Sequence, residues 1–172
     1  VYKRQHLNKY DVIHLDIQWF LANCDNVDNV VAFITKSVQA ELREIYPGVL
    51  PEEEISLSES LSRIKNIVGQ KFIIIIDEWD CVIRNSDDKE LVHKYLQFLH
   101  SLFKSEESKV FLALAYITGI LPIKKYGTHS ALNMFTEYSM TDPGELAEYF
   151  GFTEQEVSVL CEKYEMNFED AK

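Results

Sequence analysis

Two acidic residues follow a run of large apolar side chains near the middle of the chain. Residues 72–76 read Phe-Ile-Ile-Ile-Ile, and Asp77 and Glu78 come directly after them. An apolar run of this length without alternation predicts a buried strand, as in a parallel sheet covered on both faces. In open α/β sheets, ligands bind beyond the carboxyl ends of the strands. The two acids are therefore placed where a phosphate and a metal ion could bind.

The two acids match the pattern called Walker B, in which apolar residues precede Asp-Glu. In a nucleotide hydrolase the first acid holds Mg²⁺ through its water shell, and the second polarises the attacking water. Asp77 is therefore the candidate metal-binding and cofactor-binding residue, and Glu78 is a candidate catalytic residue. Asp80 could add to the site or cap the turn that follows. The alternative is that Asp77 and Glu78 only place solvent-facing charge at the end of a strand.

A second apolar run also ends at a polar residue. Residues 110–117 predict another buried strand, and Thr118 and Gly119 follow it. In P-loop ATPases a polar residue at this place lies between the Walker B acids and the γ-phosphate. Thr118 is therefore a candidate for both catalysis and cofactor binding, because its hydroxyl could bond the phosphate or the water. Alternatively, Thr118 only enters the turn before Gly119.

Strands and helices alternate along the chain and must position these residues. Strands are predicted at residues 11–17, 72–76, 110–117 and 135–140. Helices are predicted at residues 26–46, 57–68, 89–105, 143–150 and 153–165. The turn at residues 85–88 can cap the third helix, and Thr153 with Glu156 predicts a capping box for the last. This order indicates an α/β domain with a mostly parallel sheet, followed by a small helical subdomain.

The overall composition limits the classes of function. The chain has 172 residues, 47% of them hydrophobic, which is enough for one domain with a core of ordinary size. Its formal net charge of −11 argues against an extended nucleic-acid surface, because a phosphate backbone would be repelled. The three cysteines form no C-x-x-C pair, so a reducing, cytoplasmic location is expected. No apolar stretch is long enough for a membrane helix.

Several other side chains with chemical potential have ordinary explanations. Lys124 and Lys125 follow Thr118 and could reach a phosphate or a neighbouring subunit's nucleotide, or they could form a solvated pair. Four histidines lack the spacing of a metal-ligand set and are expected to be surface or packing residues: His14, His93, His100 and His129.

A metal-dependent nuclease is the rival enzyme. Glu107 and Lys109 form an E-x-K, and with Asp77 they could make the D…(D/E)-x-K metal site of a restriction-type nuclease. Such a site needs the E-x-K within or at the end of a strand that faces the Asp. Here the E-x-K precedes the predicted strand at residues 110–117, so the ATPase interpretation is favoured.

The motifs together resemble the AAA-ATPase-like family of bacterial and archaeal P-loop NTPases. Residues 76–80, Ile-Asp-Glu-Trp-Asp, are similar to the family's DEYD motif, with Trp79 in place of the more usual Tyr. Residues 118–126 and 130–139 resemble the family's segment after the next strand. Asp142-Pro143 and residues 150–157 resemble its helical tail. The resemblance covers nearly the whole chain after residue 6.

The resemblance implies a P-loop NTPase three-layer sandwich that uses ATP and Mg²⁺. However, none of the six glycines is followed by Lys, so the chain holds no G-x-x-x-x-G-K-[ST] phosphate loop. We expect that loop upstream of Val1. The expected organisation is a non-native lead at residues 1–5, an N-terminally truncated core at residues 6–141, and the start of the helical subdomain at residues 142–172.

The resemblance also implies an activity and partners. The intact parent is expected to hydrolyse ATP, whereas these residues alone are expected to be inactive without the phosphate loop. The alternative is a nucleotide-binding switch or interaction module without turnover. Family members often carry a downstream restriction-type nuclease domain. AAA-type rings imply a homo-oligomer in which an arginine reaches the next subunit's nucleotide, but no motif identifies Arg43, Arg63 or Arg84 as that residue.

Overall fold

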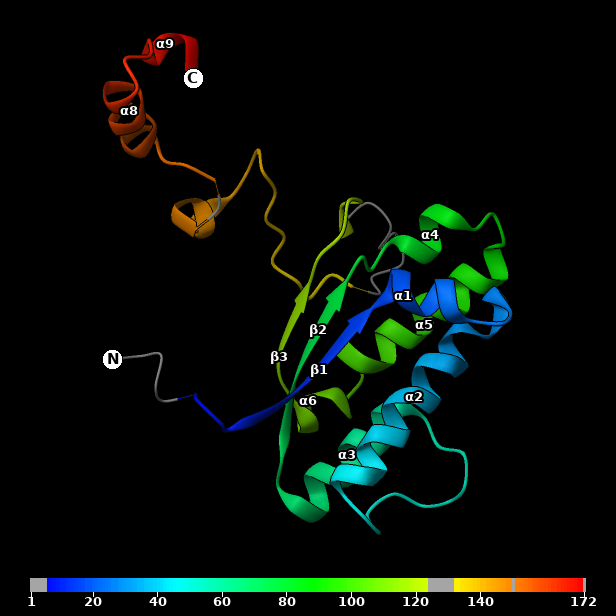
Figure 1. Ribbon diagram of the computed structural model, residues 1–172. Helices are drawn as coiled ribbons and strands as arrows, with labels where there is room; N and C mark the ends of the chain where they lie inside the picture. Colours follow the sequence, from blue (N-terminus) through cyan, green and yellow to red (C-terminus); the bar gives the residue numbers. More distant parts are fainter. Residues whose placement is uncertain (1–5, 124–131, 150, 172) are drawn as a thin grey trace. The chain divides into compact units, whose positions relative to one another are not determined.

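The computed structural model describes residues 6–123, 132–149 and 151–171. The chain divides into two compact units, Val1–Phe135 and Thr136–Lys172 (Figure 1). The first unit contains a parallel sheet with its helices, and the second contains short helical segments. Each unit is described below by itself.

The sheet of the first unit has three parallel strands in the order β1-β2-β3. They are β1 (Tyr10–Asp16), β2 (Lys71–Asp77) and β3 (Leu112–Ile117). The central strand is the isoleucine run, which is thus paired on both sides. Because all three strands are parallel, their carboxyl ends lie along one edge of the sheet. The expected α/β class is confirmed, with a small open sheet.

Helices connect the strands, and most begin at a side-chain cap. The helical segments of this unit are α1 (Ile17–Asn23), η2 (Val27–Asn29), α2 (Val30–Ile45), α3 (Leu57–Val68), α4 (Cys81–Asn85), α5 (Lys89–Phe103) and α6 (Ser108–Phe111). Asp16, Ser56 and Asp88 cap α1, α3 and α5 by accepting backbone N–H groups. Gly69 ends α3 in the left-handed conformation, with φ at 88°.

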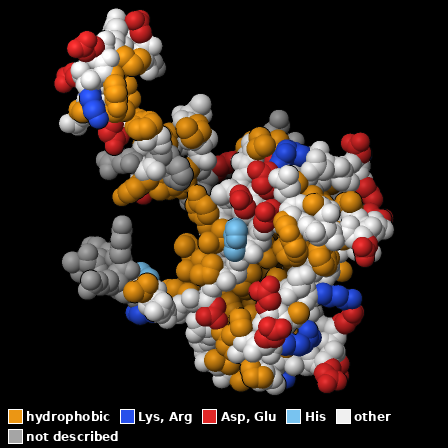
Figure 2. Space-filling model, in the orientation of Figure 1, with side chains coloured by type: hydrophobic (Ala, Val, Ile, Leu, Met, Phe, Trp, Pro, Cys, Tyr) orange, Lys and Arg blue, Asp and Glu red, His pale blue; other side chains and the backbone are white. Residues whose placement is uncertain are grey.

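The core of this unit lies on one face of the sheet. Along β2, Phe72, Ile74 and Ile76 are fully buried against the helices. On the opposite face Val12 is 58% exposed and Leu114 is 57% exposed. Figure 2 shows apolar side chains over the strands on that face. Along β2 itself, Ile73 and Ile75 on that face are partly buried. Among the described residues helices cover one face of the sheet, and the three-layer arrangement stays a prediction.

Several predicted bounds of helices and strands were wrong. Residues 110 and 111 form the end of α6 instead of the start of a strand, and Phe111 is fully buried there. Two short helices, α1 and α4, lie where no helix was predicted, because each has only one or two turns and little periodic pattern. Residues 136–139 lack regular secondary structure, so the strand predicted at residues 135–140 is absent from the described chain.

The second unit has three short helical segments. They are η3 (Gly144–Tyr149), α8 (Glu154–Lys163) and α9 (Phe168–Ala171). The predicted capping box of α8 is confirmed, because Thr153 and Glu156 bond each other's backbone N–H groups. The backbone N–H and the hydroxyl of Thr153 both donate to the Glu156 carboxylate, and they hold its pKa below the ordinary value because they stabilise the charged form.

Over its described residues, neither unit contains a helix long and apolar enough to cross a membrane. All three cysteines are free thiols.

Candidate active site

Three polar residues lie where the parallel strands end. Asp77 is the last residue of β2, and Asp16, the last residue of β1, is its partner in the register. Thr118 follows β3 directly, one position beyond the pair Ile76–Ile117. The structure thus brings Asp77 and Thr118 to the same edge of the sheet. It also adds Asp16, which sequence analysis did not single out.

Asp77 and Thr118 are in direct contact. The Thr118 hydroxyl donates a hydrogen bond to Oδ1 of Asp77, and the backbone N–H of Glu78 donates to the same oxygen at 3.1 Å. Asp77 is exposed, so a ligand has access to its carboxylate. A hydroxyl and a carboxylate at a solvent-accessible strand end are suited to bind a hard cation or a phosphate-bound water.

Glu78 points to a partner other than Asp77. Its Oε2 accepts a hydrogen bond from Nη2 of Arg84, which lies on α4. The backbone of Glu78 has φ at 55°, in the left-handed region that non-glycine residues rarely adopt. Such conformations persist where the surrounding structure enforces them, and they are common at functional sites. Asp77 and Glu78 therefore face different groups.

Asp80 is fully buried and does not face the strand edge. Its carboxylate accepts hydrogen bonds from Nε of Arg84 at 2.8 Å and from the backbone N–H groups of Leu121 at 2.9 Å and Ile120 at 3.3 Å. The charge is thus paired and hydrogen-bonded, as a buried carboxylate requires. Asp80 is therefore a tether between the loop after β2 and the loop after β3, not an additional metal ligand.

Backbone contacts bring these two loops together. Trp79 N–H donates to the carbonyl of Thr118 at 3.0 Å, and Thr118 N–H donates to the carbonyl of Ile76 at 2.9 Å. A Cβ on Gly119 would lie 2.4 Å from Cδ1 of Trp79 and 2.6 Å from Oδ1 of Asp80. Only glycine fits there without displacing these groups. The close approach fixes the position of Thr118 relative to Asp77.

A buried tyrosine binds the loop after β2. Tyr95 on α5 donates its hydroxyl to the carbonyl of Trp79 at 2.8 Å and is fully buried. Burial, with smaller contributions from the charges of Cys81 and Asp80, raises the pKa of Tyr95 far above its ordinary value of 10.0. The phenol therefore stays protonated and keeps its hydrogen bond over the physiological pH range.

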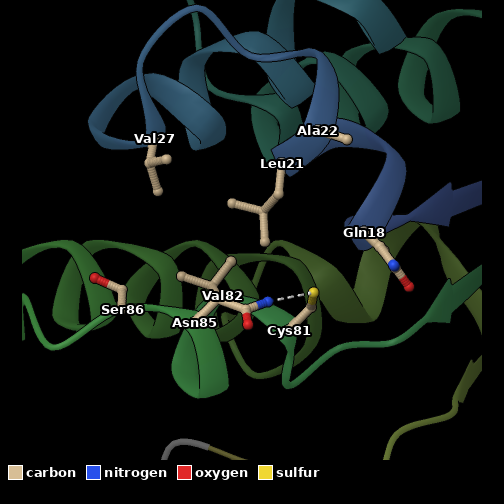
Figure 3. Close-up of a pocket in the computed structure, with 8 residues that line it drawn as sticks. All are labelled: Gln18, Leu21, Ala22, Val27, Cys81, Val82, Asn85 and Ser86. Carbon is tan, nitrogen blue, oxygen red and sulfur yellow. Dashed lines mark hydrogen bonds between the residues drawn. The ribbon is translucent and has the colours of Figure 1, made fainter.

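A hollow of this unit lies between α1 and α4. It has a volume of about 310 Å³ and is open to solvent. Its lining residues, drawn in Figure 3, are Gln18, Leu21, Ala22, Val27, Cys81, Val82, Asn85 and Ser86. Burial raises the pKa of the Cys81 thiol, which accepts a hydrogen bond from Asn85 at 3.1 Å. Asp77, Glu78 and Thr118 do not line this hollow, so it is not the candidate active site.

The donor set at the strand edge fits magnesium better than a metal held by protein ligands alone. No cluster of three or more His, Cys, Asp or Glu side chains with metal-binding geometry occurs in the described part of the chain. Mg²⁺ commonly retains several waters and takes only one or two carboxylates, with phosphate oxygens completing its shell. Asp77, with Thr118 beside it, matches that requirement.

The E-x-K of the rival nuclease lies at the opposite end of the sheet. Lys109 is on α6, before the amino end of β3, and its ammonium pairs with Glu106 at 2.5 Å. Leu112 is level with Phe72, five residues before Asp77. At about 3.3 Å per residue, Asp77 is about 16 Å along the strand from that level. The nuclease arrangement is therefore not formed. Lys124, Lys125 and His129 lie outside the described residues.

Arg84 and Asp16 are the site residues that sequence reasoning did not place. Arg84 pairs with Asp80, and its spacing of four from Asp80 would have indicated that pair once α4 was recognised. Asp16 could have been found as the acid that ends the neighbouring strand. Its pairing with Asp77 depends on the strand order, which the local sequence does not contain.

A parallel sheet with helical crossovers and acids at the carboxyl edge of its central strand defines an α/β protein of the kind that binds ligands at that edge. The chain belongs to the AAA-ATPase-like family, described as predicted AAA-ATPase, whose family model matches residues 2–129. The match includes all three predicted site residues, whereas the segments after residue 129 that resemble the family lie outside it. A search of curated proteins finds no match to this chain.

Proposed function

We propose that this chain supplies the magnesium-binding and water-activating part of an ATPase site. The observation that carries the proposal is the contact between Asp77 and Thr118 at the carboxyl edge of the sheet, within a chain of the AAA-ATPase-like family. In this assignment Asp77 holds the water shell of Mg²⁺, Glu78 orients or deprotonates the attacking water, and Thr118 senses the γ-phosphate.

Bound Mg²⁺ would neutralise charge on the β- and γ-phosphates of ATP. The chain's own residues then have separate tasks. The carboxylate of Asp77 accepts from magnesium-bound water, the hydroxyl of Thr118 bonds either Asp77 or a phosphate oxygen, and the carboxylate of Glu78 accepts a proton from the attacking water. General-base assistance of this kind typically contributes about 10²–10⁴-fold to the rate.

The 172 residues contain no G-x-x-x-x-G-K-[ST] motif. The backbone amides and lysine of that motif supply much of the phosphate-binding electrostatics in P-loop NTPases. We therefore expect the 172-residue chain alone to lack ATP hydrolysis. Turnover by the purified chain that is abolished by Glu78→Gln would contradict this expectation.

The native gene product that carries this chain provides the direct test. Steady-state ATP hydrolysis and nucleotide binding are measured for the parent and for Asp77→Asn, Glu78→Gln and Glu52→Gln. Glu78→Gln should lower kcat by about 10²-fold or more while nucleotide still binds. Asp77→Asn should weaken the magnesium dependence. Glu52 is exposed and distant in sequence from Asp77 and Glu78, so Glu52→Gln should hydrolyse ATP and bind nucleotide as the parent does. Full activity of Glu78→Gln would rule out the assigned role.

A second candidate is a nucleotide-binding switch without turnover. The pairing of Glu78 with Arg84 favours it, because the carboxylate oxygen that Arg84 engages is not free to accept from a water molecule. The same measurements separate the two functions. A switch binds Mg·ATP with loss of affinity on Asp77→Asn, but shows no hydrolysis that depends on Glu78.

A further inference from the structure

One guanidinium joins the two acids of the loop after β2. Arg84 donates Nε to Asp80 at 2.8 Å and donates Nη2 to Glu78. The side chain of Arg84 is 29% exposed, that of Glu78 is 34% exposed, and that of Asp80 is fully buried. We propose that Arg84, anchored by Asp80, is a positioning residue that fixes the carboxylate of Glu78 for water activation. This inference rests on the proposed ATPase function.

The anchor of this arrangement is rigid. Two separate segments hold the carboxylate of Asp80. Arg84 binds it from one turn along α4. The N–H groups of Ile120 and Leu121 bind it from the loop after β3, 40 and 41 residues away in sequence. Charge-assisted hydrogen bonds of this kind are about twice as strong as neutral ones. A buried carboxylate with these partners gives the guanidinium a fixed attachment point beside the strand edge.

The planar fork of arginine then transmits that position to Glu78. Nε and Nη2 belong to one rigid plane, so fixing Nε on Asp80 also fixes the direction in which Nη2 meets Glu78. The backbone of Glu78 is restrained too. Its N–H donates to Asp77, its carbonyl accepts from Cys81 N–H at 2.9 Å, and its φ is 55°. Backbone and side chain are thus held at separate points, and both determine where the carboxylate lies.

The same anchor connects Glu78 to the residue that contacts Asp77. The loop that Asp80 holds begins at Thr118, whose hydroxyl donates to Asp77. Asp80 therefore fixes Thr118 through the backbone after β3 and fixes Glu78 through Arg84. Residues that hold reacting groups in place affect the rate steeply, since a displacement of about 1 Å can cost about 10²-fold. Loss of Arg84 should accordingly lower turnover without weakening nucleotide binding.

The kinetic test compares Arg84→Met with Arg43→Met in the native gene product. Both changes remove one positive charge and keep an unbranched stem, but Arg43 lies on α2 and bonds the carbonyl of Pro51. Arg84→Met should lower kcat at least about tenfold, with KM for Mg·ATP within about twofold of the parent. Arg43→Met should change neither. An unchanged or raised kcat, or a rise in KM alone, would overturn the positioning role.

Arg84→Lys tests the requirement for a fork. A single ammonium keeps the charge but lacks two donors in one plane, so it cannot reproduce both contacts. We expect kcat of Arg84→Lys to remain at least about threefold below the parent. Full recovery by lysine would show that charge alone suffices, and would contradict the proposal. If Arg84→Met fails to fold, Arg84→Lys carries the kinetic comparison.

A double-mutant cycle tests the link without any turnover. Urea unfolding midpoints are measured for the same protein with Arg84→Lys, Glu78→Gln and both changes. The shift caused by Arg84→Lys should be smaller once Glu78 is Gln, because the charged partner is already lost. Additive shifts would show that the two side chains are not coupled. If the parent has no ATPase activity, the proposed function fails, and the cycle still decides whether Arg84 holds Glu78.

Discussion

Asp16 and Asp77 are register partners at the carboxyl ends of neighbouring parallel strands. Side chains of such partners point to the same face of the sheet, and neighbouring strands lie about 4.8 Å apart. Asp16 also accepts the N–H of Trp19 at 2.9 Å and thereby caps α1. Two negative charges at this spacing repel each other, and a divalent cation near Asp77 would relieve that repulsion.

Asp16→Asn should therefore weaken Mg²⁺ binding by the native gene product. Asparagine can keep the cap of α1, so the change removes mainly the charge. At an effective dielectric constant near that of water, the lost attraction is about 1 kcal/mol, or about fivefold in affinity. Magnesium dependence of nucleotide binding measures the effect, which should diminish at high salt. Asp25→Asn, an exposed acid after α1, is the matched control, and an equal loss in both variants would contradict the prediction.

Thr118→Val should reduce magnesium-dependent nucleotide binding or turnover, whereas Thr118→Ser should retain most of it. Valine has nearly the same shape but cannot donate to Asp77. A hydrogen bond to a charged group contributes about 1.5–3 kcal/mol. Titration with Mg²⁺ at a fixed ATP concentration compares the two variants. Equal behaviour of valine and serine would show that the hydroxyl has no part in the site.

Gly119→Ala should lower the free energy of unfolding by about 1–3 kcal/mol, because its Cβ would collide with Trp79 and Asp80. Urea denaturation followed by tryptophan fluorescence measures the loss. Gly48→Ala is a useful control: its added Cβ meets nothing within 4 Å, so only the cost of a positive φ applies. A loss no larger than that of Gly48→Ala would mean that the two loops separate easily.

Tyr95→Phe should cost about 1–2 kcal/mol at neutral pH, since it leaves the buried carbonyl of Trp79 without its donor. The same variant should change the response to alkali. The pKa of Tyr95 is raised in the folded protein, so above about pH 10 the unfolded chain loses this proton and the folded chain keeps it. Stability should therefore fall as pH rises beyond that value.

Urea unfolding between pH 8 and about pH 11 measures this slope. Tyr95→Phe should make it shallower. Tyr164→Phe should leave it unchanged, because Tyr164 is exposed in the second unit. A parallel decline of parent and Tyr95→Phe would show that other groups cause the alkaline loss. Tyr46, whose pKa is raised by burial and by its hydrogen bond to Asp11, and Cys81, whose pKa is raised by burial, are expected to contribute to the remaining slope.

Local sequence patterns determined most of the secondary structure of the first unit. The isoleucine run forms β2, helical periodicity locates α3 over Leu57–Val68, and Asp88 caps α5 from the predicted turn. These features depend on side-chain period, caps and stop signals within one segment, all of which the sequence contains. The placement of Asp77, Glu78 and Thr118 at strand ends could likewise be predicted, since it depends only on where each apolar run stops.

Tertiary structure decided which of these residues meet. Burial of one sheet face alone, the helical state of residues 110 and 111, and the register of Asp16 with Asp77 depend on how the strands pair and which helices pack on them. The link from Leu121 to Asp80 spans 41 residues, and no local pattern encodes it. The sequence by itself identified two acids and a hydroxyl at strand ends. Only the packed fold buried Asp80 as a tether between two loops and paired Glu78 with Arg84. The reason is that contacts between distant segments form only when the sheet brings their loops together.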